Sequence, residues 1–211
     1  MEWFYLLLSF GKEHFMRREL YNEIQAYSPK TEQEEQDKKV MLKYIETFDD
    51  ILTRENEFAH MTASPWIVNE EYTKVLMIYH RIYDSWGWCG GHSDGESDQL
   101  FVALKEGAEE TGLTSIRPVS EQIIAIDILP VPSHKKRGAF ISSHVHLNVT
   151  YLCVADEREE LHHNEEENKG ALWVPIEEVC KKVSQWDRDM IPVYQKLNER
   201  IKEMREKKHM E

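Results

Sequence analysis

Positive charge is scarce in this sequence of 211 residues. Only 26 Lys and Arg residues stand against 39 Asp and Glu residues, so the formal net charge is −13. Non-specific nucleic-acid binding needs a basic surface that neutralises phosphates, and we therefore expect no nucleic-acid partner. The excess of acid leaves two explanations open: it can keep the protein soluble, or it can hold a cation.

Cysteine is scarce as well. The three cysteines, Cys89, Cys153 and Cys180, form an odd and sparse set, which disfavours a disulfide framework. Their spacing is also too wide for a zinc knuckle. We therefore expect a reducing, cytoplasmic location for the protein.

The sequence opens on an apolar stretch, residues 1–10, that is too short to span a bilayer. A secretory signal would need positive charge before this stretch, but Glu2 stands there, and no small-residue cleavage site follows. We expect a packed helix, or an upstream extension of a chain that begins at Met16. No membrane partner is predicted.

The apolar content, 41% hydrophobic and 10% aromatic residues, is sufficient for a folded core. Residues 1–56 are predicted to form an N-terminal helical extension, because apolar residues recur at helical spacing from 33 to 54. Two alternatives mark the start of the second helix: Ser28-Pro29, or a capping box from Thr31 to Glu34.

The pattern changes at Phe58, and residues 57–211 are predicted to form the main domain. Strands and helices are mixed in it, which favours a sheet with helices packed on it. A turn at residues 69–71 joins the first two strands, a Trp- and Gly-rich loop covers 83–95, and a turn covers 132–138. The predicted strands are 60–68, 73–80, 121–131, 139–154 and 171–174, and the predicted helices are 98–111, 175–183 and 189–208.

The segment from Gly90 to Leu113 is the most informative. Glu106, Glu109 and Glu110 are spaced so that they share one face of a helix, where like charges repel by a few tenths of a kcal/mol. Only Lys105 offsets them within the segment. Three carboxylates on one rigid face suit Mg²⁺, which prefers oxygen ligands. The alternative is an ordinary solvated helix face.

This segment resembles the Nudix box, whose pattern is Gly, five residues, Glu, seven residues, then Arg-Glu-aliphatic-x-Glu-Glu-x-Gly-aliphatic. Residues 105–113 are Lys-Glu-Gly-Ala-Glu-Glu-Thr-Gly-Leu, and Gly91 matches the opening glycine. The Trp-rich loop before Gly91 and the Trp-Val-Pro run at 173–175 resemble the flanks of the box. The resemblance covers roughly residues 58–185. It implies an α+β fold, a Nudix-type α/β/α sandwich with a mixed β-sheet, here with an N-terminal helical extension.

Three positions depart from the Nudix pattern. Lys105 replaces the arginine, which keeps the charge but loses the planar guanidinium. Gly107 replaces an aliphatic residue and weakens the helix by roughly 1 kcal/mol relative to Ala. The loop is shifted by one residue, so that Glu96, Ser97 and Asp98 compete for the first acidic position of the box.

The resemblance implies a Mg²⁺-dependent hydrolase that cleaves a diphosphate linkage in a nucleoside-diphosphate-X substrate by activated water, with Mn²⁺ as the alternative metal. Glu106 and Glu110 are the expected direct metal ligands, with Glu109 a further ligand or the base and Lys105 the positioning cation. In many Nudix members the general base comes from a loop before the last strand, which here points to Glu166 or Glu167. A solvated acidic turn is the alternative for that loop.

The substrate site is expected to draw on several elements. On the strand from 143 to 151, His144 and His146 share a face with Asn148 and Thr150, which indicates a cleft wall or ordinary strand surface. His60 and His92 are expected to be structural. The substrate-binding candidates are Gly90, Gly91, Trp86, Arg137, His144 and His146.

Two other functions remain open. An isopentenyl-diphosphate isomerase-like enzyme would use a Cys-Gly-His motif, but Cys89 is followed by Gly90-Gly91-His92, one residue out of step. A Nudix-fold ligand-binding or regulatory module without turnover is the other alternative. The N-terminal helices could form a homodimer interface or fold over the pocket.

The identity of the X group is not encoded in any sequence pattern that we can interpret.

The acidic excess is concentrated in two segments. Residues 90–113 carry six acids and one lysine, and residues 156–170 carry seven acids and two bases, so each segment has a net charge of −5. The Nudix resemblance places both segments around a divalent cation. The charge therefore favours a metal site over general solubility.

Overall fold

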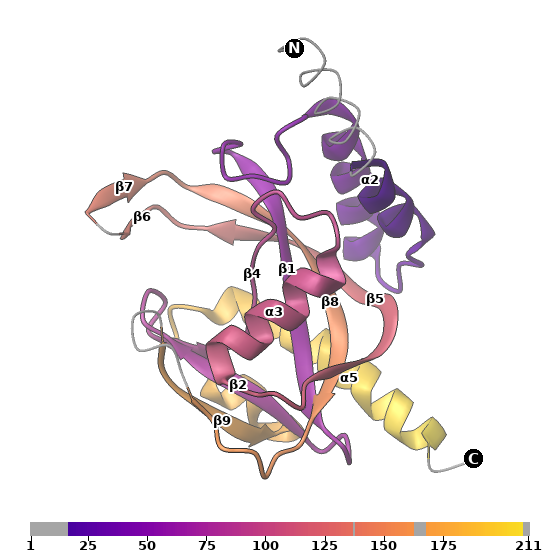
Figure 1. The fold of residues 1–211 in the computed structure, drawn as a ribbon, viewed down its shortest axis with the longest axis vertical. Coiled ribbons are helices and arrows are strands. Elements are labelled where there is room, and N and C mark those ends of the chain that lie inside the picture. The colour runs from indigo at the N-terminus through magenta and orange to yellow at the C-terminus, as the bar shows by residue number, and fades with distance from the viewer. Residues whose placement is uncertain (1–16, 137, 163–167, 209–211) are drawn as a thin grey trace, which may run out of the picture. The chain divides into compact units, whose positions relative to one another are not determined.

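A computed structural model describes residues 17–136, 138–162 and 168–208 of the chain (Figure 1). Three of the expected site residues, Arg137, Glu166 and Glu167, lie outside the described residues. The alternatives for the first 16 residues lie outside them as well.

Two helices precede the domain, as expected. Residues 17–26 form the first, and α2 (Glu32–Thr47) is the second. Thr31 caps α2, because its Oγ1 accepts a hydrogen bond of 3.2 Å from the backbone N–H of Glu34. The carboxylate of Glu34 in turn accepts from the backbone N–H of Lys30, at 2.9 Å. Of the two alternative starts, Thr31 is confirmed. The expectation that the helix extends to residue 54 is wrong, because the backbone becomes extended at Phe48.

Seven strands of the described chain form one mixed sheet, in which β3, β2, β1, β8 and β5 follow one another, β4 pairs with β1, and β9 pairs with β2. The pairs of β2 with β1, β3 and β9 are antiparallel, with Val68 opposite Val75 and Leu76 opposite Trp173. The strands are β1 (Ala59–Asn69), β2 (Lys74–His80), β3 (Ser85–Gly87), β4 (Gly91–His92), β5 (Arg117–Val131), β8 (His144–Ala155) and β9 (Asn168–Pro175).

Short strands lie where the sequence predicted only loops. The Trp- and Gly-rich loop contains β3 and β4, and the predicted turn at 132–138 contains β6 (His134–Lys136), which pairs with β7 (Ala139–Ile141) in a hairpin (Figure 1). The predicted helices are confirmed with small shifts of their ends. They are α3 (Gln99–Thr111), η1 (Ile176–Glu178) followed by α4 (Val179–Lys182), and η2 (Arg188–Met190) followed by α5 (Ile191–Lys208).

The chain divides into two compact units. Unit 1 comprises the described residues up to Ala63, with His92–Val102 and Ala125–Val149. Unit 2 comprises Ser64–Gly91, Ala103–Ile124 and the described residues from Thr150 onward.

Unit 2 has an apolar layer on each side of its strands. Side chains alternate along a strand, so Ile67 and Trp66 of β1 point to opposite faces. On one face Ile67 and Leu76 form a buried cluster against which Leu104 of α3 packs. On the other face Trp66 stacks on Tyr194 of α5, with ring centroids 5.4 Å apart. Helices α3 and α5 therefore cover the two faces of these strands (Figure 1).

Unit 1 buries the apolar side of α2, including Met41 and Ile45. The carboxylate of Asp37 on α2 accepts a hydrogen bond of 2.9 Å from the backbone N–H of Ile128 in β5. This bond fastens the helix to the strand within the unit. None of the helices in the described part of the chain has the length and apolar character that a membrane crossing requires.

Candidate functional site

Helix α3 carries the three glutamates that the sequence singled out, and both of its ends are specified locally. At its start, the carboxylate of Asp98 accepts a hydrogen bond of 2.9 Å from the backbone N–H of Phe101, as an N-cap does. At its end, Gly112 adopts a φ of 72°, which a side chain would disfavour, and its N–H donates to the carbonyl of Ala108 at 2.8 Å. These ends place all three glutamates in the C-terminal half of the helix.

Glu110 is the most buried of the three, with 6% of its surface exposed. Its Oε2 accepts a hydrogen bond of 3.0 Å from the backbone N–H of Gly90. Its Oε1 lies 3.5 Å from the side-chain nitrogen of Asn168, the first residue of β9. Glu110 therefore links α3 to the glycine loop and to β9 within unit 2.

Glu106 lies against Gly91. A Cβ atom at Gly91 would come within 2.7 Å of the Glu106 Cγ and closer still to its carboxylate. Real Cβ atoms essentially never approach so closely, so a larger residue at 91 would displace the glutamate. This contact gives a physical reason for glycine at position 91, the first position of the Nudix box.

Lys105 bridges two of the glutamates from the solvent side. Its Nζ lies 3.4 Å from Glu106 Oε1 and 3.6 Å from Glu109 Oε2. Partial burial acts to lower the pKa of Lys105, but the charges of Glu106 and Glu109 outweigh it and raise the pKa. The Glu109 side chain is 59% exposed, so its pair with Lys105 is a weak surface pair.

Gly107 has a packing role that the sequence did not reveal. A Cβ at this position would lie 2.7 Å from Ile116 Cδ1 and 3.1 Å from Pro65 Cγ. The glycine lets α3 approach β1 and the segment after the helix more closely than an aliphatic residue would. The departure from the aliphatic pattern therefore reflects close packing of the helix.

The oxygen atoms around Glu110 fit a divalent cation of the Mg²⁺ class. Asn168 is fully buried, and its Oδ1 has no hydrogen-bond partner among the described residues. A buried acceptor without a donor is costly, and a cation would satisfy it. The carboxylates of Glu106 and Glu110 are hard oxygen donors of the same kind, and the side-chain nitrogen of Asn168 lies 3.5 Å from Glu110 Oε1. Asn168 could not be predicted from the sequence, because one Asn beside an acidic loop carries no distinctive signal.

Two acids before the helix have local partners. Glu96 Oε1 accepts from the backbone N–H groups of Ser97 and Asp98, at 2.8 and 3.0 Å. Asp98 is occupied as the N-cap of α3. Both carboxylates therefore hold the turn that starts the helix, and the first acidic position of the box stays a prediction.

Cys89 is a buried thiol beside the glutamates. It is 1% exposed, and burial, followed by the charges of Glu110 and Glu106, raises its pKa well above the ordinary value. A thiol in this state is a poor nucleophile.

Two tryptophans of the Trp- and Gly-rich loop have different surroundings. Trp88 is buried and packs edge-on against Trp66 and Tyr194, which makes it a core residue. Trp86 is half-buried and meets Tyr79 edge-on, with centroids 5.2 Å apart. Its role as a substrate contact stays a prediction.

The polar face of β8 is buried rather than exposed. His144 is 8% exposed, Asn148 1% and Thr150 0%, so ordinary strand surface is ruled out for these residues. In unit 1, His144 and His146 lie beside His60 and His92, a grouping that no local sequence pattern predicts. Their role as substrate contacts stays a prediction.

A family model described as "NUDIX domain" matches residues 58–194. No curated protein matches the sequence of the chain.

Solved structures give likenesses at low identity. An Ap4A hydrolase from C. elegans in a binary complex has 16% identity and a TM-score of 0.46, covering 65% of this chain and 93% of its own. A NUDIX family hydrolase from Clostridium perfringens has 19% identity and a TM-score of 0.46, covering 66% and 96%. A MutT NUDIX hydrolase from Burkholderia pseudomallei has 16% identity and a TM-score of 0.41, covering 64% and 96%.

Proposed function

Because the chain belongs to the Nudix family, we propose that it is a pyrophosphohydrolase that cleaves a diphosphate linkage in a nucleoside-diphosphate-X substrate. The observation that supports this most directly is the arrangement of Glu106 and Glu110, which α3 holds against the glycine loop at Gly90 and Gly91. Such an arrangement presents hard carboxylate oxygens beside a backbone that can approach a phosphate closely.

Glu106 and Glu110 are the proposed ligands of Mg²⁺ or Mn²⁺, with Glu109 as a further ligand or base and Asn168 as an added oxygen donor. A divalent cation held there would polarise a phosphoryl oxygen and lower the pKa of water. Lys105 orients Glu106 by charge, and its pair with the exposed Glu109 is weaker. The Gly90 N–H holds one carboxylate oxygen of Glu110, and the other lies 3.5 Å from the side-chain nitrogen of Asn168.

The remaining roles are proposed on the resemblance alone. Glu166 or Glu167 serves as general base, if Glu109 does not, by taking a proton from the attacking water. Arg137, His144, His146 and Trp86 contact the substrate.

The test is hydrolysis by Glu106→Gln and Glu110→Gln variants. Each substitution keeps the shape of the side chain but removes a charged ligand, so kcat should fall by about 100-fold or more, since a ligand interaction contributes several kcal/mol. Glu35→Gln on the exposed side of α2 makes the same charge change away from the site and should leave kcat unchanged. Near-wild-type turnover in either site variant would contradict the metal assignment.

The substrate class requires a screen of nucleoside diphosphate sugars, dinucleoside polyphosphates, ADP-ribose and nucleoside triphosphates with Mg²⁺. Turnover of one class identifies X. Tight binding of one ligand without turnover of any would favour the non-catalytic module instead. The isomerase-like alternative is disfavoured by Cys89, whose burial and raised pKa do not suit a catalytic thiol.

We further propose that residues 57–211 form the hydrolase domain and residues 1–56 an extension that forms a homodimer or covers the pocket. Light scattering of the full chain separates these two roles.

The thiols of Cys89, Cys153 and Cys180 are free, which supports the proposed cytoplasmic location.

A further inference from the structure

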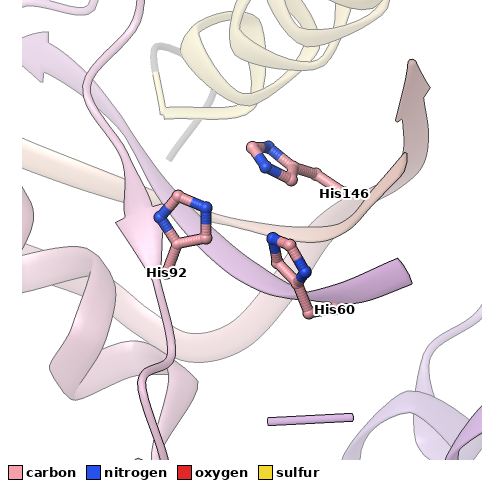
Figure 2. A group of neighbouring side chains, drawn as sticks. All are labelled: His60, His92 and His146. Atoms are coloured by element: carbon pink, nitrogen blue, oxygen red, sulfur yellow. The ribbon is translucent and has the colours of Figure 1, made fainter. Parts of the chain in front are cut away.

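Four of the ten histidines gather in unit 1. His60 comes from β1, His92 from β4, and His144 and His146 from β8. The ring centroid of His60 lies 5.0 Å from that of His92, 5.1 Å from that of His144 and 5.2 Å from that of His146. Figure 2 shows the rings of His60, His92 and His146 turned toward one another from three separate strands.

Hydrogen bonds to backbone carbonyls set the tautomers of two of these rings. Nδ1 of His60 lies 2.9 Å from the carbonyl oxygen of Asn56, and Nδ1 of His144 lies 2.9 Å from that of Ser142. A carbonyl only accepts, so each Nδ1 carries the proton and each Nε2 presents a lone pair. Metal-binding histidines are commonly oriented by such a bond from the second ring nitrogen.

The Nε2 lone pair of His60 accepts no hydrogen bond from the described residues. His60 is 4% exposed, and its buried Nε2 has no hydrogen-bond partner among the described residues. A buried polar nitrogen without a partner is costly, and native proteins rarely keep one without a reason. A metal ion between the rings would satisfy this nitrogen.

The spacing of the nitrogens suits one ion. One ring nitrogen from each of His60, His92 and His146 can be chosen so that all lie within 4.8 Å of one another. Tetrahedral Zn²⁺ holds imidazole nitrogens at about 2.0–2.1 Å, which separates them by about 3.3 Å. Small side-chain rotations would bring the three nitrogens to this distance. His144 is not one of the three: its Nε2 lies 3.3 Å from Nε2 of His146, which is a hydrogen-bond distance.

Burial favours the neutral form of two of these rings. It lowers the pKa of His146 to about 2, and neighbouring His92, His60 and His144 act in the same direction. Burial also lowers the pKa of His60, although its bond to Asn56 acts in the opposite direction.

We propose that His60, His92 and His146 bind one divalent transition-metal ion of the Zn²⁺ class through their imidazole nitrogens. The donor set is all nitrogen, which favours Zn²⁺, Co²⁺ or Ni²⁺ over Mg²⁺. His144 lies beside the site as a hydrogen-bonding neighbour of His146. Three protein ligands leave one coordination position for water or a substrate oxygen, so a substrate contact at His146 remains compatible with this site.

The first experiment titrates ZnCl₂ alone into the metal-free full chain in a calorimeter. One ion per chain should bind to the wild type, and His60→Gln, His92→Gln and His146→Gln should each weaken binding at least tenfold. His144→Gln should have a smaller effect, because we propose it as a neighbour rather than a ligand. His162→Gln, at an exposed histidine of unit 2, is the matched control and should bind as the wild type does.

A double variant, Glu106→Gln with Glu110→Gln, should keep its zinc affinity, so this site is tested independently of the proposed hydrolase. Lack of zinc binding by the folded wild type, or equal losses in the His162→Gln control, would overturn the proposal.

X-ray absorption of the zinc-loaded wild type supplies a test that does not depend on the folding of variants. Imidazole scattering from nitrogens at about 2.0–2.1 Å is expected. Thiolate sulfur from a cysteine, or a shell of oxygens alone, would place the ion elsewhere and overturn the assignment.

Discussion

At the scale of single residues, Gly107 shows how a departure from a family pattern can be structural. The sequence marked it as a weak point of the helix, since Gly lowers helix stability by about 1 kcal/mol relative to Ala. The structure shows that Ile116 and Pro65 occupy the space of the missing side chain. Close packing therefore offsets the helix penalty, a balance that depends on contacts between residues distant in the sequence.

We predict that Gly107→Ala destabilises the protein despite its better helix propensity. Overpacking a filled interior costs typically about 1–3 kcal/mol, which exceeds the gain of about 1 kcal/mol from the helix. Urea unfolding measures the change in the free energy of unfolding. The loss should shrink or reverse in an Ile116→Ala background, which removes the closest contact. An equal loss in both backgrounds would show that the contact with Ile116 is not the cause.

Single residues also mark the limit of what the sequence predicts. Glu106, Glu109 and Glu110 were identifiable because their spacing is local and belongs to one helix. His60 and His92 appeared structural, because each is an isolated histidine with no local pattern. Only the pairing of β1 with its neighbours in the sheet brings them to His146. The same holds for Asn168, which meets Glu110 across many residues of sequence.

At the scale of secondary-structure elements, long periodic segments were predictable and short ones were not. Strands β1 and β2 and helices α3 and α5 lie close to their expected positions, since each carries enough residues to show a period. Strands β3, β4 and β6 have only two or three residues and show none. Pairing with a neighbouring strand, rather than intrinsic preference, defines such short elements.

The start of α2 gives an element-scale prediction. Thr31→Ala removes the cap of the helix and should lower the free energy of unfolding by about 1 kcal/mol. Thr31→Ser keeps the hydroxyl and should retain most of the stability. Ser28→Ala tests the alternative start and should have almost no effect. Denaturant unfolding of the three variants decides between the starts, and a larger loss at Ser28 than at Thr31 would contradict the observed cap.

At the scale of the whole molecule, the α+β fold with its mixed sheet and preceding helices agrees with the sequence-based expectation. The resemblance succeeded because its motif combines local carboxylates with glycines that the fold requires at particular places. The identity of the X group could not be predicted, since it depends on side chains that only the tertiary fold assembles. The basic residue Arg137 and the acids Glu166 and Glu167 remain predictions.

The net charge of −13 gives the prediction that concerns the molecule as a whole. If the negative charge serves only solubility, repulsion between the acidic groups destabilises the folded state. Any salt then reduces this repulsion by screening. A cation bound at Glu106 and Glu110 stabilises the folded state further, by about 1.4 kcal/mol at ten times its Kd. MgCl₂ should therefore raise the Tm by about 3–5 °C more than NaCl at equal ionic strength.

The double variant Glu106→Gln with Glu110→Gln should lose this magnesium-specific increase and keep the increase that NaCl produces. Calorimetric melting of both proteins in the two salts separates the contributions. Equal Tm values in MgCl₂ and NaCl for the wild type would mean that the acidic excess acts through repulsion alone. A magnesium-specific increase that survives in the double variant would place the ion away from α3, for which the acidic segment at 156–170 is the next candidate.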